Sequence, residues 1–340
     1  MTFPTLPPIG MAGTGVYIPP QVLTGQEIAA RTGLPNFVVL EKMGIREIHV
    51  AGPQDTITAM AAKAARRALD AAGLDPLQLD AILYHGSEYK DHLVWSAASK
   101  IQHLLGARNA FAFEIYALCA GAPIAYKVAR DMMRLDDRLQ NVLLVSASRE
   151  NDLIDLSNLR TRFMFNFGAG ASAAVFRRGL VRNLVLESAA RTDGSLADTV
   201  VLTPAEDGLH LMPPEMGTLH GRLDVQGADY MAERLDAVSL ANFVAVITEA
   251  VQRSGYALSD LRFLGITHMK VSFFREILAA VGLTPDQAVY LDHYGHIQSV
   301  DQVLALELGL AQGKIKDGDL IALAGAGTGY TWSATAVRWG

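Results

Sequence analysis

One residue of the 340 combines reactive chemistry with a position that could activate it. Cys119 is the only cysteine, and it lies between an apolar run at 113–118, expected to be a buried strand, and a helical pattern that opens near Pro123. A cysteine between a strand and a helix lies near unpaired backbone N–H groups, whose partial positive charge favours thiolate over thiol. Because free cysteine is also among the most buried residue types, a small core side chain is the alternative interpretation.

Two of the nine histidines follow patterns that place them near such a nucleophile. His268 comes directly after the apolar run 263–267, at the carboxyl end of a predicted strand, where α/β proteins place their sites. His296 opens a helical pattern that carries Asp301, and five residues of helix bring that carboxylate within reach of an imidazole. Each histidine alone could be structural. Together with Cys119 they form a candidate Cys–His–Asp set for nucleophilic catalysis.

Three glycine-rich stretches resemble phosphate-binding loops, but each leads into a strand instead of a helix. They lie at 10–15, 168–173 and 325–329. A dinucleotide site needs a helix N-terminus that faces the pyrophosphate, so tight turns between buried strands are the better interpretation. The turn at 327–329 could still present backbone N–H groups as oxyanion donors. One thiol and scattered histidines lack the ligand spacing of a zinc site, so no metal is expected.

Composition argues against several other classes of function. A net charge of −6, without runs of lysine and arginine, argues against nucleic acid as a partner. The apolar runs look strand-sized, which predicts no membrane span, and the N-terminus has no signal-like pattern. With a single cysteine no internal disulfide can form, which favours a cytoplasmic location. Half of the residues are hydrophobic and 19% are charged, which suits a large core and a subunit interface.

Apolar periodicity predicts alternating strands and helices in two similar halves. A helix and the strand 141–146 follow Cys119, and a helix and the strand 319–324 follow His296 in the same order. We therefore expect one half at 1–178 that carries the nucleophile and a second half at 179–340 that carries the histidines. Residues 190–227 lack periodicity and are expected to cross over the active site. The other predicted elements are strands at 9–18, 80–84, 171–176, 183–189, 263–267 and 330–338, a short helix after Thr24, and helices at 56–72, 94–105, 228–253, 273–280 and 297–310.

Taken in order, several motifs resemble the thiolase superfamily, most closely its β-ketoacyl-acyl-carrier-protein synthase III branch. Residues 117–121, Ala-Leu-Cys-Ala-Gly, are similar to the nucleophile motif of that family, and 167–171 are similar to its FGxGA turn. Residues 327–332 resemble its C-terminal GGGFTWG, 44–47 its early GIRE, and 95–106 the helix before its nucleophile. The resemblance runs nearly end to end and implies a duplicated, thiolase-like five-layer αβαβα fold.

The resemblance also implies roles for single residues. Cys119 would accept an acyl group from a CoA or acyl-carrier-protein thioester, and the N–H groups of Cys119 and Gly329 would form the oxyanion hole. His268 falls on the first catalytic histidine of the family. No cofactor would be tightly bound, and the family is usually a homodimer that pairs through residues 111–118.

Two further positions concern the substrates. The aromatic residue that stacks on the CoA adenine in the family falls near 37–38, and the simplest alignment places Val38 there, which favours a carrier-protein donor. Glu88 falls near the general base of the related hydroxymethylglutaryl-CoA synthases. A solvated loop carboxylate is the simpler interpretation of Glu88.

One departure from the family changes the expected chemistry. The decarboxylating synthases carry Gly-Asn where this chain has Gly295-His296. In those enzymes the catalytic histidine and the asparagine donate hydrogen bonds to the thioester oxygen while malonyl loses CO2. An imidazole oriented by Asp301 can instead accept a proton from an attacking hydroxyl or amine. Cys–His–Asp variants of the family are known as acyltransferases that form esters or amides, and this chain resembles them.

We therefore expect an acyltransferase that moves an acyl group through Cys119 to a small hydroxyl or amine acceptor, in secondary metabolism. The first alternative is a Claisen condensation, decarboxylating or not, with His268 and His296 as hydrogen-bond donors. The second is a non-catalytic partner subunit. The sequence leaves open the acyl chain, the acceptor and the choice between CoA and carrier protein.

Overall fold

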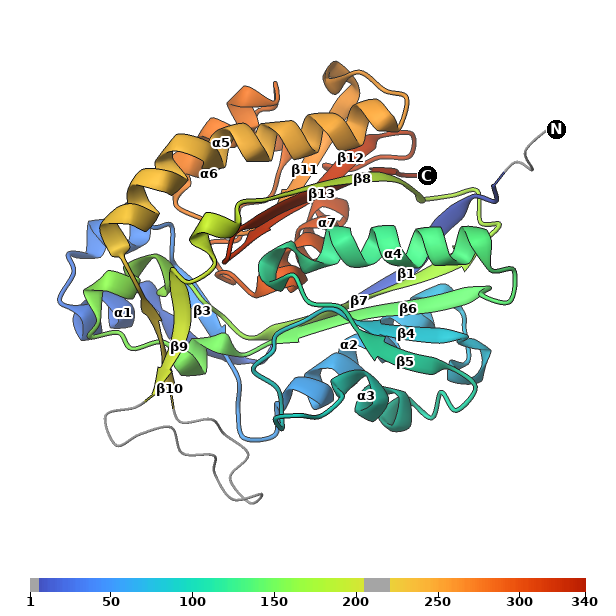
Figure 1. The fold of residues 1–340 in the computed structure, drawn as a ribbon, viewed down its shortest axis with the longest axis horizontal. Helices are drawn as coiled ribbons and strands as arrows, with labels where there is room; N and C mark the ends of the chain where they lie inside the picture. The colour runs from blue at the N-terminus through green and yellow to red at the C-terminus, as the bar shows by residue number, and fades with distance from the viewer. Residues whose placement is uncertain (1–5, 205–220) are drawn as a thin grey trace.

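The computed structural model describes residues 6–204 and 221–340, which build alternating layers of helix and sheet (Figure 1). In that view two layers of strands lie one above the other, with helices between them and further helices on both outer faces. This is the five-layer α/β arrangement that the sequence predicts.

The lower strand layer in Figure 1, the first half-sheet, comes from the N-terminal half of the chain. In order across the layer its strands are β1 (Ile9–Tyr17), β7 (Gly170–Arg178), β6 (Asn141–Ser148), β4 (Ala81–Tyr84) and β5 (Phe111–Glu114). Strand β4 pairs in parallel with β5 on one side and with β6 on the other. The carboxyl ends of these three strands therefore meet at one edge, where parallel sheets place their sites.

The upper strand layer, the second half-sheet, comes from the C-terminal half. Its strands are β8 (Leu184–Thr192), β13 (Thr331–Arg338), β12 (Leu320–Gly327) and β11 (Leu261–Ile266), in that order. Strands β11 and β12 are parallel, whereas β13 runs antiparallel to both of its neighbours. The pair Gly10 and Leu184 joins β1 to β8, so both layers belong to one nine-stranded sheet. The predicted division at residue 178 falls between β7 and β8.

Three pairs of helices cover these strand layers. The middle pair is α4 (Gly121–Leu135) and α7 (Asp301–Ala311), since α4 contacts β6 and β8 while α7 contacts β1 and β11. Helices α2 (Ile57–Ala72) and α3 (Ala97–Leu105) cover the outer face of the first half-sheet. Helices α5 (Ala228–Arg253) and α6 (Val271–Ala280) cover the outer side of the second.

Helix α2 shows how the sequence sets these layers. The Thr56 side chain accepts the N–H of Ala59 and caps the first turn, and Gly73 ends the helix in the left-handed conformation. Alanines at helical spacing form its buried face, which allows a close approach to β1 and β7. These buried alanines are Ala61, Ala64, Ala65 and Ala68.

Helix α5 is the described helix that is long and apolar enough to cross a membrane, judged by length and composition alone. This differs from the expectation that apolar runs are only strand-sized. Its side chains Phe243, Val246 and Ile247 are buried in the core beside β13 and β8. Of its most apolar 18-residue window 28% is buried, so the helix packs on the half-sheet with one face only.

The remaining elements lie in loops between the layers. A short helix, α1 (Gly25–Thr32), is capped by Thr24 as predicted. Strands β2 (Gln21–Thr24) and β3 (Glu47–Val50) form a two-stranded antiparallel sheet that the sequence did not indicate. A second two-stranded antiparallel sheet, β9 (Val200–Pro204) with β10 (Gly221–Val225), lies in the stretch 190–227. Residues 205–220 of that stretch lie outside the described residues, and the crossing over the active site stays a prediction.

Two predicted elements differ from the structure. The run 113–118 is not a buried strand, because β5 ends at Glu114 and forms the edge of the sheet, where Phe111 is 50% exposed. The helix expected from residue 297 begins only at Asp301, because Gln298 has a positive φ of 52° and starts a 3₁₀ turn that ends at Val300. The other predicted helices and strands are present, with ends that differ by a few residues.

Candidate active site

Cys119, His296 and Asp301 form one continuous hydrogen-bonded chain. Sγ of Cys119 lies 3.0 Å from Nε2 of His296, and Nδ1 of His296 lies 2.6 Å from Oδ2 of Asp301. All three residues are buried, with Asp301 fully enclosed. These are the contacts that a nucleophile, a base and an orienting carboxylate require. The structure thus brings together three of the four side chains that the sequence analysis singled out for catalysis.

The main chain turns sharply just before Cys119. After β5, Leu118 adopts a left-handed conformation with φ of 50°, which a leucine rarely adopts. Cys119 follows in a 3₁₀ turn that leads directly into α4. The sulfur therefore lies at the start of a helix, where the helix dipole favours a negative charge. Backbone strain of this kind often marks a functional residue that the surrounding fold holds in place.

His296 is held by main-chain pairing with the segment before β7. Its N–H donates to the carbonyl of Asn166 at 2.7 Å, and its own carbonyl accepts from the N–H of Gly168 at 2.9 Å. The Phe167 ring lies edge-on to the imidazole. Gly295 permits this close approach, because a Cβ there would come within 2.2 Å of the Asn166 carbonyl oxygen. The motif at 167–171 and the glycine before His296 together fix where the imidazole lies.

Asp301 and His296 do not lie on one helix, although the sequence predicts that they do. Since α7 begins at Asp301, the carboxylate lies in the first helical turn and the imidazole lies in the loop before it. Its Oδ1 accepts the main-chain N–H of Ile297 at 2.7 Å, and its Oδ2 accepts the main-chain N–H of His268 at 2.8 Å. The carboxylate is therefore fixed on both oxygens before it binds the imidazole.

The environment of His296 favours its protonated form. Burial alone would lower the pKa of His296, but Cys119 and Asp301 on its two sides raise that pKa well above the ordinary value. An imidazolium beside a thiolate is the resting state of many activated cysteines. The same arrangement makes the pKa of His296 depend on whether the sulfur is charged.

His268, the fourth predicted residue, uses both ring nitrogens on other partners. Its Nε2–H donates to the carbonyl of Gly44 at 3.0 Å, and its Nδ1 accepts from the side-chain amide of Asn166 at 2.7 Å. Burial lowers the pKa of His268 to about 4, so the ring is neutral near pH 7. The structure does not bring this imidazole into the hydrogen-bonded chain of Cys119.

Gly327 lies closer to the nucleophile than Gly329 does. A Cβ on Gly327 would come within 2.6 Å of the Ala117 carbonyl oxygen and 3.1 Å of the Cys119 nitrogen. A Cβ on Gly329 would meet no described atom within 4 Å. Gly329 lies in the connection between β12 and β13, with φ of 112°. The oxyanion role of the Cys119 and Gly329 N–H groups stays a prediction. Gly327 leaves space for the nucleophile turn, and so does Gly325, where a Cβ would come within 2.5 Å of the Cys119 carbonyl oxygen.

Sequence reasoning missed several buried polar residues around this chain. Gln302 donates to the Cys119 carbonyl at 3.3 Å and to the Ala324 carbonyl at 3.1 Å, which ties the nucleophile turn to β12. Asn166 orients the His268 ring. In the sequence only their positions could have indicated them: Asn166 directly precedes the motif at 167–171, and Gln302 directly follows Asp301. Further missed residues include Ser87, Glu150 and Gln298, which are buried as well.

Two observations bear on metal ligands and on the adenine position. Within 6–204 and 221–340, no three His, Cys, Asp or Glu side chains are grouped as metal ligands would be. Near the position expected to stack on adenine, Phe37 is 51% exposed, with Nζ of Lys42 5.4 Å from the centre of its ring. An aromatic face is thus available one residue before Val38.

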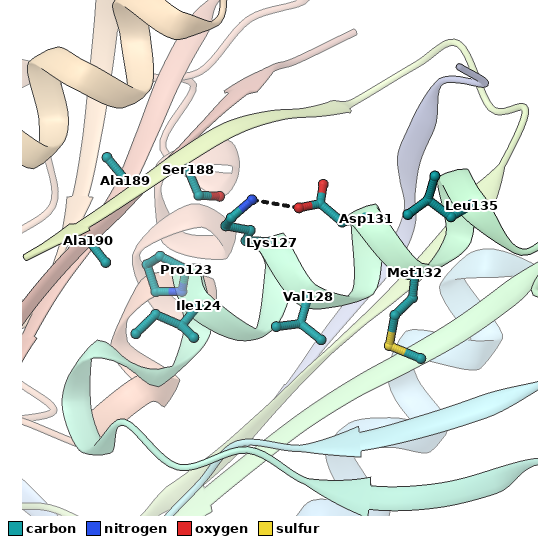
Figure 2. Close-up of a pocket in the computed structure, with 10 residues that line it drawn as sticks. All are labelled: Pro123, Ile124, Lys127, Val128, Asp131, Met132, Leu135, Ser188, Ala189 and Ala190. Atoms are coloured by element: carbon teal, nitrogen blue, oxygen red, sulfur yellow. Dashed lines mark hydrogen bonds and ion pairs between the residues drawn. The ribbon is translucent and has the colours of Figure 1, made fainter. Parts of the chain in front are cut away.

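One surface pocket, between α4 and β8, lies apart from the hydrogen-bonded chain of Cys119 (Figure 2). Its volume is about 540 Å³, and none of Cys119, His296 and Asp301 lines it. The Lys127–Asp131 ion pair is its only charged feature. Because this pair is self-neutralising and the other lining groups are apolar or small, the pocket offers no catalytic chemistry. Figure 2 shows Lys127 and Asp131 on the side of α4 that is turned towards Ser188, while Val128 and Met132 point to the opposite side of the helix.

Comparison with known proteins agrees with this fold. The family described as 3-oxoacyl-[acyl-carrier-protein (ACP)] synthase III matches residues 113–194, and its C-terminal counterpart matches residues 251–339. The solved synthase III of Aquifex aeolicus VF5 has a TM-score of 0.83 at 26% identity, covering 97% of this chain and 100% of that one. The priming β-ketosynthase of the R1128 polyketide pathway has a TM-score of 0.85 at 24% identity, covering 100% and 98%, and shows the fold alone.

Curated relatives extend the match over nearly the whole chain. The β-ketoacyl-[acyl-carrier-protein] synthase III of Synechocystis sp. is 30% identical over 333 residues, which cover 96% of this chain and 97% of the relative. The enzyme of the same name from Sphingopyxis alaskensis is 29% identical over 329 residues, with coverage of 96% and 98%. The chain belongs to the β-ketoacyl-acyl-carrier-protein synthase III family of thiolase-fold enzymes.

Proposed function

We propose that this protein is an acyltransferase, which carries an acyl group on Cys119 and passes it to a hydroxyl or an amine. The observation that carries the proposal is the hydrogen-bonded chain from Cys119 through His296 to Asp301. An imidazole held by a carboxylate is a general base. A hydroxyl or amine must lose a proton as it attacks, so this base fits such an acceptor.

The first half-reaction loads the enzyme. The Cys119 thiolate attacks the carbonyl carbon of an acyl thioester, a new C–S bond forms, and the C–S bond to the donor breaks. The His296 imidazolium gives its Nε2 proton to the departing thiolate. Its raised pKa keeps that proton available in the free enzyme. The products are acyl-Cys119, neutral His296 and the free thiol of the donor.

The second half-reaction depends on a lower pKa of His296 once Cys119 is acylated. Acylation removes the sulfur charge, which is one of the causes of the raised pKa of His296. The neutral imidazole then takes the proton of the acceptor while the acceptor oxygen or nitrogen attacks the acyl carbon. The bond to Cys119 breaks, the ester or amide leaves, and the imidazolium–thiolate pair is restored.

The second candidate is a Claisen condensation, and the names of the relatives favour it. The curated relatives and the solved Aquifex enzyme are synthases of β-ketoacyl chains. The expected donors of that reaction are His268 and His296. The His268 ring is engaged with Gly44 and Asn166, and His296 is engaged with Asp301 and Cys119, which supports acyl transfer instead.

The proposal extends to the acyl donor and to the setting of the reaction. The relatives are named for acyl carrier protein, which supports a carrier-protein or CoA thioester as the donor. A homodimer, a cytoplasmic location and a place in secondary metabolism complete the proposal.

Intact-protein mass spectrometry tests the proposed function in two steps. Incubation with a panel of acyl-CoA and acyl-carrier-protein thioesters should add one acyl group to the protein. Later addition of hydroxyl and amine acceptors should discharge that group as an ester or amide. A protein that takes up no acyl group from any thioester would contradict the proposal.

A further inference from the structure

We propose that Ser87, Glu150 and Gln298 form an acceptor subsite beside Cys119, which selects a nucleophile carrying a second O–H or N–H donor next to the attacking one. A vicinal diol or an amino alcohol has this chemistry. The inference rests on the proposed acyl transfer and names the residues that choose its acceptor.

The topology brings these three residues to the reaction edge of the sheet. Ser87 and Glu150 closely follow β4 and β6, and β4 lies next to β5, the strand that leads to Cys119. Gln298 lies two residues after His296. The Ser87 hydroxyl donates to Oε1 of Glu150 at 2.7 Å. The Gln298 amide and His296 are both close enough to Glu150 to lower its pKa.

The cluster is buried but incomplete. Ser87 is fully buried, Gln298 is 2% exposed and Glu150 is 9% exposed. Within the described residues, Oε1 of Gln298 has no hydrogen-bond partner. Its main chain is also held at a φ of 52°, a conformation that glutamine rarely adopts. A buried carbonyl oxygen without a donor is unfavourable, so the site is suited to a ligand that brings one.

The charges around Glu150 set the chemical class of that ligand. Burial raises the pKa of Glu150, and the Ser87 and Gln298 side chains oppose that effect. The neighbouring cation, Arg149, is directed to Asp152 and the Asp55 carbonyl instead. Donors from a bound ligand would therefore stabilise both the carboxyl of Glu150 and the free oxygen of Gln298. An anionic group in this place would meet a carboxyl and an amide oxygen and be repelled.

One acceptor molecule can supply both the attacking nucleophile and the hydrogen-bond donor that the cluster lacks. Its first hydroxyl or amine faces Nε2 of His296 and attacks the acyl carbon. A second donor, one carbon further along, reaches Glu150 or Gln298. No bond to the cluster forms or breaks, since its role is to bind and orient the acceptor.

Paired probes test this selection on the acylated enzyme. Cys119 is first loaded from an acyl thioester, and the discharge rate is then followed by mass spectrometry with 1-propanol against 1,2-propanediol, and with propylamine against 1-amino-2-propanol. We expect the second member of each pair to discharge the wild type faster by about tenfold, the effect of one good hydrogen bond. Glu150→Gln and Gln298→Met should bring this ratio close to one.

Control variants keep the result interpretable. Glu276→Gln changes an exposed carboxylate on α6, on the outer side of the second half-sheet, and should keep the wild-type ratio. The yield of acyl-Cys119 reports folding of each variant, and Ser87→Ala serves as a further test of the cluster. A wild type that discharges equally with both members of each pair, or an unchanged ratio in the variants, would overturn the subsite and leave acyl transfer standing. Failure of every alcohol and amine to discharge the wild type would overturn the acyl transfer itself, and the subsite with it.

Discussion

The main-chain N–H of His268 donates to Oδ2 of Asp301 at 2.8 Å, and that same oxygen binds the imidazole of His296. The residue predicted to match the first catalytic histidine of the family thus contributes its backbone to the hydrogen-bonded chain. Its ring is bound to Gly44 and Asn166. A backbone contact does not depend on the side chain. Substitution can therefore test the contributions of the His268 and His296 rings one at a time.

Replacing the His268 ring should impair acyl transfer much less than replacing the His296 ring. His268→Ala keeps the N–H that holds Asp301, so we expect discharge of acyl-Cys119 within about tenfold of wild type, whereas His296→Ala should lose about 10²–10⁴ in rate. Single-turnover discharge followed by rapid quenching and mass spectrometry measures both. Comparable losses in the two variants would show that the His268 ring takes part in the chemistry.

The protonation of His296 should depend on the state of Cys119. A negative sulfur raises the pKa of His296, so removing that charge should lower it, while the contribution of Asp301 remains. NMR titration of the imidazole should therefore give a lower midpoint in Cys119→Ala than in the wild type. In the acylated wild type, whose sulfur is also uncharged, the rate of acyl transfer should rise with pH through the lowered pKa of His296. It should then level off, because the neutral imidazole is the base. An unchanged midpoint in Cys119→Ala would rule out this coupling.

Cys119 should be the sole site of acylation. It is the only thiol of the chain, so Cys119→Ala should lose the whole acyl adduct seen in the wild type. Intact-protein mass spectrometry compares the two proteins after the same incubation. Equal labelling of both would place the acyl group on another residue.

The family, the order of most elements and the Cys–His–Asp set were accessible from the sequence, because each depends on local pattern. Cys119 is the only thiol, and His268 and His296 stand next to recognisable motifs. Apolar periodicity indicated the helix at 228–253 with the bounds that the structure has. These features need no knowledge of how distant segments pack.

The parts that the sequence did not indicate depend on tertiary contacts. Whether the His268 ring faces Cys119 depends on Gly44 and Asn166, which are far from it in the chain. The left-handed conformations of Leu118 and Gln298 are imposed by the surrounding fold against local preference. The run 113–118 was expected to be buried because its residues are apolar, whereas β5 is an edge strand. Edge position is a property of the sheet and not of the strand.

Strand β5 should form the contact between two copies of the chain. It lies at the end of the strand order, and Phe111 is 50% exposed there, as expected of a surface that a second copy would cover. Phe111→Glu should shift the protein from dimer towards monomer in light scattering at micromolar concentration. Val181→Glu, at a residue that is 69% exposed outside this strand, serves as the matched control. A wild type that is already monomeric would contradict the predicted dimer.

The most direct test of the central claim compares wild type with His296→Asn, which restores the amide of the decarboxylating synthases. Both proteins are loaded at Cys119 and then offered either a hydroxyl or amine acceptor or malonyl-acyl carrier protein. We predict that the wild type forms an ester or amide and releases no CO2. His296→Asn should lose that transfer by about 10²–10⁴, the usual cost of a missing general base. Release of CO2 and a β-keto product from the wild type, with no ester or amide, would contradict the account and establish condensation as the reaction.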